Sequence, residues 1–253
     1  FEADMQTAKD AGILPMMTYA KDGGTSFVFQ ALMANNSSAE DVQNWILQKS
    51  GTFDNQAAQD AASTLQDWNN KGYMPEGVNA VDASTALSRF CNGEGLFFPS
   101  GNWNLDTVAK ALGDDVQFFA FPGATSEDEP NVAANAGAFY GIPVNAKNRD
   151  AAAAFLDYTQ SAEAQQIIVD NSGYLPKSST LDLKANSALQ QSMFDAYADV
   201  LTSGHTSDFI NNATAGMQSS GLIPNFQLLL DNSITPQEFT KNVQAQYDKE
   251  AKR

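Results

Sequence analysis

Basic residues are scarce in this sequence. It contains 14 Lys and Arg against 30 Asp and Glu, which gives a formal net charge of −16 over 253 residues. Nucleic acids and anionic membrane surfaces attract basic proteins through their phosphates, so this charge argues against both as partners. An acidic surplus usually serves solubility, and that interpretation is sufficient here. We therefore expect no nucleic-acid partner.

Cysteine and histidine are almost absent, with one residue of each. The single cysteine, Cys91, excludes an internal disulfide, and its place beside Phe90 indicates a small buried side chain. Together with His205 it offers too few ligands for a zinc site. The acidic run at residues 127–129 lacks the alternating oxygen ligands and the glycine of a calcium loop. We expect neither a metal nor a cofactor.

Long apolar runs are missing as well. No segment approaches the roughly 20 apolar residues that a membrane-spanning helix needs. The first ten residues, "FEADMQTAKD", are amphipathic and do not resemble a signal peptide. A mature exported protein would begin in this way, and so would a fragment of a longer chain.

Helical patterns dominate what is present, with short apolar segments between them. Ser38 and Thr235 are predicted helix caps, and Trp45 and Trp68 lie at core spacing on their helices. Strands alternating with helices indicate an α/β chain. We predict helices at 1–12, 26–36, 37–49, 55–72 and 235–253, two consecutive helices within 147–173, and strands at 95–101, 116–123 and 136–145.

The order of these segments is similar to that of a known family. One long run, residues 51–103, carries an amphipathic helix, then "KGYMP", then a strand that ends in "GNW". "VQFFAFPG", "AGAFYGIPVNAKN", "SAEAQQ", "SGYLP" and "SITPQEFTKNVQAQYDK" follow in order. Together they resemble the extracellular solute-binding proteins of ABC sugar importers, the family 1 group that includes maltose-binding protein.

The resemblance implies a type II periplasmic-binding-protein-like fold, in which two lobes close on a ligand. Residues 1–134 and 187–253 would form the C-terminal lobe, and residues 135–186 would belong to the N-terminal lobe, with hinge crossings near 135 and 186. Family members begin with a strand–helix–strand segment, whereas Phe1 falls inside a helix beyond it. We therefore expect this chain to be the C-terminal portion of such a protein.

The stretch "LFFPSGNWNLD", residues 96–106, is the strongest candidate for a binding site. Ligands of open α/β sheets bind outside the carboxyl ends of the strands, and here Asn102, Trp103 and Asn104 follow an apolar strand. An indole can cover the apolar face of a sugar ring, and amides can bind its hydroxyls. The alternative is that Trp103 is a packing residue under a loop.

The resemblance adds candidates from three other segments. The glycine turn "AKDGGTS" matches a family turn that lines the cleft, although it could be a plain turn. The segment "NAGAFYG" lies at the expected hinge, where alternation lets only one of its two aromatic residues face the cleft. The segment "DFINNATAG" lies where family members supply further contacts. These segments contribute Asp22, Gly24, Thr25, Phe139, Tyr140, Asn211 and Asn212.

The resemblance implies a binding protein rather than an enzyme. It would capture a neutral mono- or oligosaccharide as a monomer and deliver it to the permease subunits of an ABC importer, in a periplasm or as a cell-surface lipoprotein of a Gram-positive organism. A glycoside hydrolase would need two carboxylates across the sugar, and Asp106, near Trp103, sits at a predicted helix start instead. A fragment that binds another protein is the third alternative.

Overall fold

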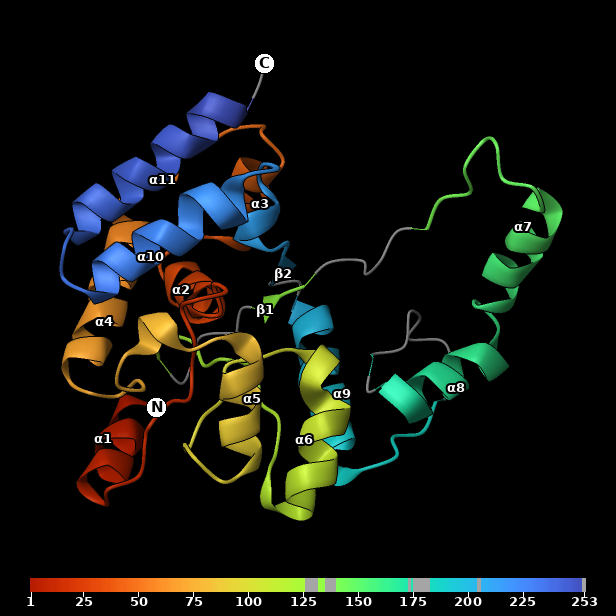
Figure 1. Ribbon diagram of the computed structural model, residues 1–253, viewed down its shortest axis with the longest axis horizontal. Coiled ribbons are helices and arrows are strands. Elements are labelled where there is room, and N and C mark those ends of the chain that lie inside the picture. Colours follow the sequence, from red (N-terminus) through yellow and green to blue (C-terminus); the bar gives the residue numbers. More distant parts are fainter. Residues whose placement is uncertain (126–131, 135–139, 173, 175–182, 204–205, 252–253) are drawn as a thin grey trace. The chain divides into compact units, whose positions relative to one another are not determined.

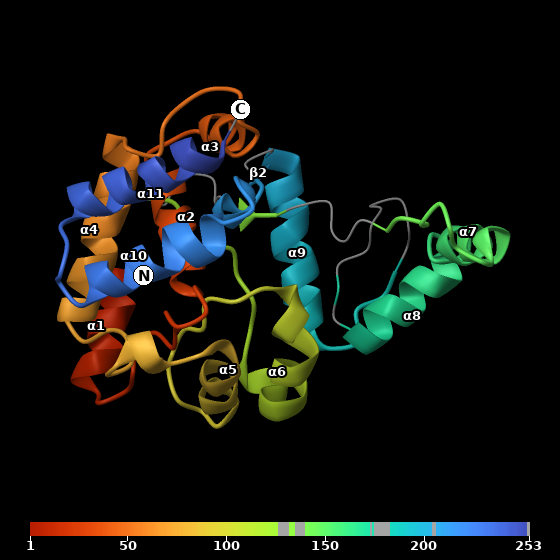
Figure 2. The same cartoon turned by 45° about the horizontal axis from the view of Figure 1, so that its top comes forward.

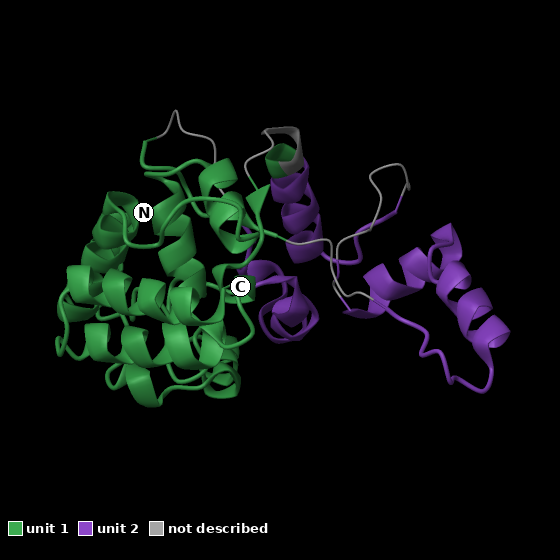
Figure 3. Ribbon diagram, turned by 90° about the horizontal axis from the view of Figure 1, so that it is seen from above, with its two compact units in different colours: residues 1–100, 120–134, 199–253 green, residues 101–119, 135–198 purple. Residues whose placement is uncertain are grey.

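The computed structural model describes residues 1–125, 132–134, 140–172, 174, 183–203 and 206–251. These residues form two compact units, which Figure 3 draws in different colours. Unit 1 comprises residues 1–100, 120–134 and 199–253, and unit 2 comprises residues 101–119 and 135–198. The predicted segment 135–186 therefore falls wholly within unit 2, while its assignment to a lobe stays a prediction.

Unit 1 is built mainly of helices, and α2, α4, α10 and α11 pack against one another (Figures 1 and 2). Its helices are α1 (Glu2–Asp10), α2 (Thr25–Ala34), α3 (Ala39–Ile46), α4 (Gln56–Asn70), α5 (Ala83–Cys91), α10 (Ile223–Leu230) and α11 (Pro236–Glu250). Shorter turns of helix are η1 (Val78–Ala80), η4 (Ile210–Asn212) and η5 (Met217–Leu222).

Side-chain caps begin several of these helices, as predicted. The Ser38 hydroxyl accepts a hydrogen bond from the Asp41 backbone N–H at 3.0 Å and starts α3. At α11, Thr235 and Glu238 form a complete capping box, in which the Glu238 carboxylate accepts from the Thr235 N–H at 2.8 Å. Each such cap satisfies a backbone donor that the helix itself leaves unpaired. The start of these helices is therefore encoded locally.

Aromatic side chains form the centre of the unit 1 core. The ring centroids of Phe29 and Phe53 lie 5.6 Å apart, and those of Phe226 and Phe239 lie 4.9 Å apart. Phe29 also meets Phe226 and Phe239, each at 5.3 Å. These four rings come from α2, the segment before α4, α10 and α11, so they join elements that are distant in the sequence. All four are essentially inaccessible to solvent.

Strand pairing is sparse, and here the sequence-based expectation was largely wrong. The described residues contain one two-stranded parallel sheet, β1 (Val132–Ala133) with β2 (Thr206–Ser207). The predicted strand at 95–101 makes only an isolated parallel bridge, between Phe97 and Met16. Residues 116–123 and 140–145 are not strands, and residues 136–139 lie outside the described part. An apolar alternating pattern favours extended chain, but a strand also needs a paired neighbour.

Unit 2 contains η2 (Asn102–Asn104), α6 (Leu105–Leu112), η3 (Gly113–Asp115), α7 (Arg149–Tyr158), α8 (Ala162–Ser172) and most of α9 (Ala188–Ser203). The two consecutive helices predicted within 147–173 are confirmed as α7 and α8. Gln190 of α9 is fully buried, and its side chain donates to the Val169 carbonyl at 2.9 Å and accepts from the Asn186 N–H at 2.7 Å. This side chain fastens α9 to α8.

Candidate functional site

The predicted site residues divide between the two units. Asp22, Gly24, Thr25, Asn211 and Asn212 belong to unit 1. The residues that belong to unit 2 are Asn102, Trp103, Asn104 and Tyr140, while Phe139 lies outside the described part of the chain.

Trp103 lies in η2, directly before α6, and 42 % of its surface is exposed. Asn102 and Asn104, on either side of it, are partly exposed. The Asn102 side chain makes no hydrogen bond to another described residue, so its amide remains available to donate and accept. An accessible indole between amides is suited to a ligand with apolar faces and hydroxyl edges.

Asp106 has a local role, as the sequence predicted. It lies in the first turn of α6, and its carboxylate accepts from the Lys110 ammonium at 2.7 Å. This pair joins residues one helical turn apart, and a carboxylate at this end of a helix also favours the helix dipole. These contacts account for Asp106 without a catalytic function.

Asp22 is exposed, yet it has a structural contact. Its carboxylate accepts from the Ala83 backbone N–H at 2.9 Å, at the first residue of α5. The neighbouring Lys21 pairs with Asp82 at 3.2 Å, and Asp82 is the residue that caps the same helix. The turn is thus attached to the start of α5.

Gly24 and Thr25 are buried, which limits direct contact with a ligand. The aromatic ring of Tyr19 covers Gly24, so a Cβ at this position would collide with the ring. The Thr25 hydroxyl is buried and has no hydrogen-bond partner among the described residues. Burial, and secondarily the negative charge of Asp22, raises the pKa of the Tyr19 phenol. Tyr19 is therefore a neutral aromatic residue beside Asp22, and sequence reasoning missed it.

Asn211 and Asn212 are held in η4 by contacts with α2. Gln30 of α2 accepts from the Ile210 N–H at 3.0 Å and donates to the Asp208 carbonyl at 2.7 Å. The Asn212 amide donates to the Asp208 carboxylate at 2.8 Å, whereas the partly exposed Asn211 side chain has no hydrogen bond within the described residues. Of these two residues, Asn211 has the more available amide.

Gln218, in η5, contacts the glycine turn, although the two are far apart in the sequence. The Gln218 side-chain N–H group of η5 donates to the Asp22 carbonyl at 3.1 Å. The same side chain lies against Gly23, whose φ of +85° a residue with a side chain rarely adopts. The side-chain carbonyl oxygen of Gln218 is buried and has no hydrogen-bond partner in the described part of the chain. No sequence pattern pointed to Gln218, because 196 residues separate it from Asp22.

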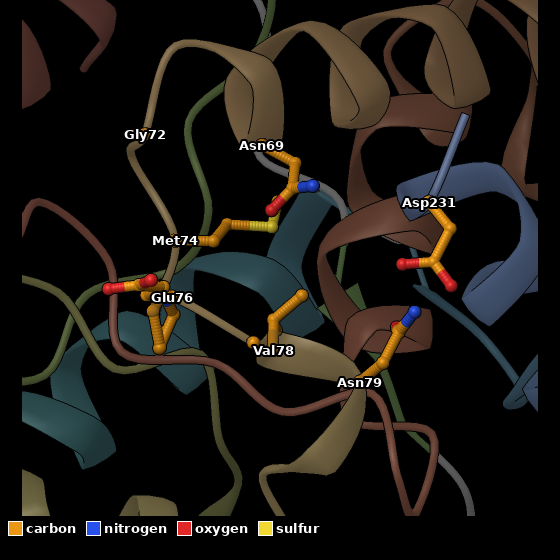
Figure 4. Close-up of a pocket in the computed structure, with 9 residues that line it drawn as sticks. Asn69, Gly72, Met74, Glu76, Val78, Asn79 and Asp231 are labelled. Atoms are coloured by element: carbon orange, nitrogen blue, oxygen red, sulfur yellow. The ribbon is translucent and has the colours of Figure 1, made fainter.

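The surface of unit 1 also has a hollow of about 480 Å³ beside the loop after α4. In Figure 4, Asn79 and Asp231 point toward one another across it, above an apolar floor that includes Val78. The predicted site residues do not line this hollow. The Glu76 and Asp231 carboxylates that line this hollow are hydrogen-bond acceptors, so the hollow suits a molecule with hydrogen-bond donors rather than an anion.

Neither a cluster of metal ligands nor a membrane-spanning helix is found within the described residues. They include no group of three or more His, Cys, Asp or Glu side chains arranged to hold a metal ion. None of the helices in these ranges is both long and apolar enough to cross a membrane.

Known proteins share this fold. The family model for "bacterial extracellular solute-binding protein" matches residues 1–194. A chitin oligosaccharide binding protein matches 98 % of the chain with a TM-score of 0.81 at 18 % identity. The bacterial solute receptor AcbH, described as exclusively preferring β-D-galactopyranose, matches 98 % with a TM-score of 0.76 at 18 % identity. The solute-binding protein RafE in complex with raffinose matches 97 % with a TM-score of 0.73 at 14 % identity.

These likenesses confirm the predicted fold, a type II periplasmic-binding-protein-like architecture. At this level of identity they concern the fold alone. The chain spans 63 % of the length of each of these three proteins. A comparison with curated proteins found no match.

Proposed function

Because the chain belongs to the bacterial extracellular solute-binding proteins, we propose that it is the substrate-binding component of an ABC importer for a neutral mono- or oligosaccharide. The sugar binds between two lobes and passes to membrane permease subunits without chemical change. The family is extracellular, which places the protein outside the cytoplasm. Within that space it is a monomer, either free in a periplasm or anchored as a lipoprotein.

The observation that carries this proposal is the exposed indole of Trp103 between two amide side chains. Sugars offer C–H faces to an aromatic ring and hydroxyls to amides, so this group suits a neutral carbohydrate. The related structures support the same ligand class, because their names refer to a chitin oligosaccharide, galactopyranose and raffinose. They do not share one sugar, so the individual sugar has to be found by experiment.

Trp103→Ala tests the stacking role. We expect the substitution to weaken sugar binding by roughly 1–3 kcal/mol, the scale of a removed aromatic contact at a binding site. Calorimetry with galactose, raffinose, a chitin oligosaccharide and a xylan oligosaccharide measures the affinity, and chromatography of the same mixtures detects cleavage products. The protein should be expressed from its complete reading frame.

Leu228→Ala is the matched control, because Leu228 is also 42 % exposed but belongs to α10 of unit 1 and is not one of the predicted site residues. It should bind each sugar as the unchanged protein does. Unchanged affinity in Trp103→Ala would contradict the stacking role. Cleaved sugar would favour the hydrolase alternative, and absence of binding to the whole panel would favour a protein-interaction fragment.

A further inference from the structure

Gly101 lies two residues before Trp103 and has no conformational need to be glycine. Its φ of −133° and ψ of 178° are those of ordinary extended backbone, which any residue adopts. A Cβ at this position would nevertheless collide with the Trp103 side chain. The three nearest atoms to such a Cβ are carbons of the six-membered ring of the indole. A side chain at position 101 would therefore displace the ring of Trp103.

The contact has a consequence for the indole. A tryptophan side chain has two rotatable bonds, and backbone packed against the ring restricts both. A side chain that is already ordered loses less freedom when a ligand binds, so it binds more tightly for the same contacts. Because 42 % of Trp103 is still exposed, the ring is both supported by Gly101 and accessible.

The same arrangement occurs a second time among the predicted site residues. Gly24 has helical φ and ψ of −62° and −25°, so it also has no backbone need for glycine. The ring of Tyr19 covers it, and a Cβ would collide with three carbons of that ring. Gly141 shows the opposite case, because a Cβ there would meet nothing within 4 Å. Close contact between a glycine and an aromatic ring therefore occurs at Gly101 and Gly24 but not at Gly141.

We propose that Gly101 is a positioning residue, which supports the Trp103 indole so that it is held ready to stack on a sugar. This rests on the proposed function, since it concerns the same ligand. The new element is that the affinity for the sugar depends on Gly101, which has no side chain and does not itself contact the sugar. Gly101→Ala should leave the backbone unstrained and displace only the indole.

The test uses the protein expressed from its complete reading frame and labelled with 5-fluorotryptophan. The chain has three tryptophans, so the ¹⁹F spectrum should contain three resonances, and Trp103→Phe identifies the one from Trp103. Gly101→Ala should shift or broaden that resonance and leave those of Trp45 and Trp68 unchanged. The control Gly141→Ala should leave all three unchanged.

Calorimetry with raffinose and a chitin oligosaccharide then measures the effect on binding. Gly101→Ala should weaken the binding of whichever sugar binds by about 2- to 10-fold, the size expected when a side chain leaves its preferred rotamer. In a Trp103→Ala background the added methyl group no longer meets a ring. There Gly101→Ala should change neither the affinity nor the Tm.

The outcomes separate the inference from the proposed function. An unmoved Trp103 resonance in Gly101→Ala overturns the positioning role, even if Trp103→Ala abolishes sugar binding and so supports the proposed function. A moved resonance with unchanged affinity also overturns it. If Trp103→Ala itself leaves the affinity unchanged, the stacking function fails and the inference falls with it. A moved resonance with weakened binding, both absent in the double variant, supports it.

Discussion

The three tryptophans of the chain lie in different environments. Trp68 is 2 % exposed, and its indole N–H donates to the Glu2 carboxylate at 2.6 Å. Trp45 is 4 % exposed and stacks on Tyr247, with ring centroids 4.7 Å apart. Trp103 is 42 % exposed. The same residue type therefore belongs to the core at two positions and is exposed at the third.

At the residue scale, Trp68→Ala and Trp103→Ala should differ in their effect on the free energy of unfolding. Removing a fully buried tryptophan costs about 3–5 kcal/mol, because it leaves a cavity and forfeits burial. Removing an exposed one changes stability by about 0.5 kcal/mol or less. Urea unfolding followed by circular dichroism measures both. Equal destabilisation by the two substitutions would contradict the division between core and site.

At the scale of elements, the start of α5 depends on one charged cap. The Asp82 carboxylate accepts from the Thr85 N–H at 2.9 Å and from the Ser84 hydroxyl at 2.9 Å, and it pairs with Lys21. The hydrogen bonds from Thr85, then that from Ser84 and the contact with Lys21, hold the pKa of Asp82 well below its usual value of 3.8. Asn55 caps α4 in the same way, but without a charge.

Asp82 should make stability depend on pH. Its pKa is lower in the folded than in the unfolded chain, so its contribution is fully present above the usual value of 3.8 and is lost as the pH falls below it. Asp82→Asn keeps a capping side chain but removes the charge, so its Tm should fall less than that of the unchanged protein between pH 5 and pH 2. Calorimetric melts at several pH values measure this.

The matched control is Asn55→Ala, which removes an uncharged cap from α4. It should lower the Tm by a similar amount at every pH in that range, because no proton is involved. A parallel pH dependence in Asp82→Asn and the unchanged protein would show that another carboxylate is responsible.

At the scale of the whole molecule, α7 and α8 leave apolar side chains exposed. Phe155 is 63 % exposed, Tyr158 45 % and Ile167 50 %, and α7 contains no buried residue. Exposed groups of this kind forgo roughly 1.5–3 kcal/mol each relative to full burial. We propose that residues 135–186 belong to an N-terminal lobe, whose remaining part covers these helices, and that residues 1–134 and 187–253 form the C-terminal lobe.

Residues 1–253 expressed alone should then bind sugar weakly and melt with low cooperativity or aggregate. A longer protein that includes the sequence encoded upstream of Phe1 should bind more tightly and melt in one transition, because a second wall then closes on the ligand. Calorimetry and thermal melts of the two proteins make the comparison. Equal affinity and an equally cooperative melt would contradict the lobe assignment.

Local features of the fold could be predicted from the sequence. The caps at Ser38 and Thr235 were found because a capping side chain and the backbone N–H from which it accepts lie three residues apart. The core positions of Trp45 and Trp68 were found because helical spacing places them on apolar faces. Short helices such as α5 were missed, since nine residues that mix serine, threonine and arginine with apolar side chains span too few turns to show a clear helical period. The order of segments identified the family, which the family match then confirmed.

Tertiary structure alone decided how distant segments pair. Extended apolar segments at 95–101 and 116–123 are visible in the sequence, but whether they become strands depends on neighbours that the pattern does not contain. The ring of Tyr19 over Gly24 and the contact of Gln218 with Asp22 are equally invisible, because they depend on the directions of side chains from separate elements. Sequence periodicity records which residues are apolar, whereas the partner of each side chain follows from how the whole chain packs.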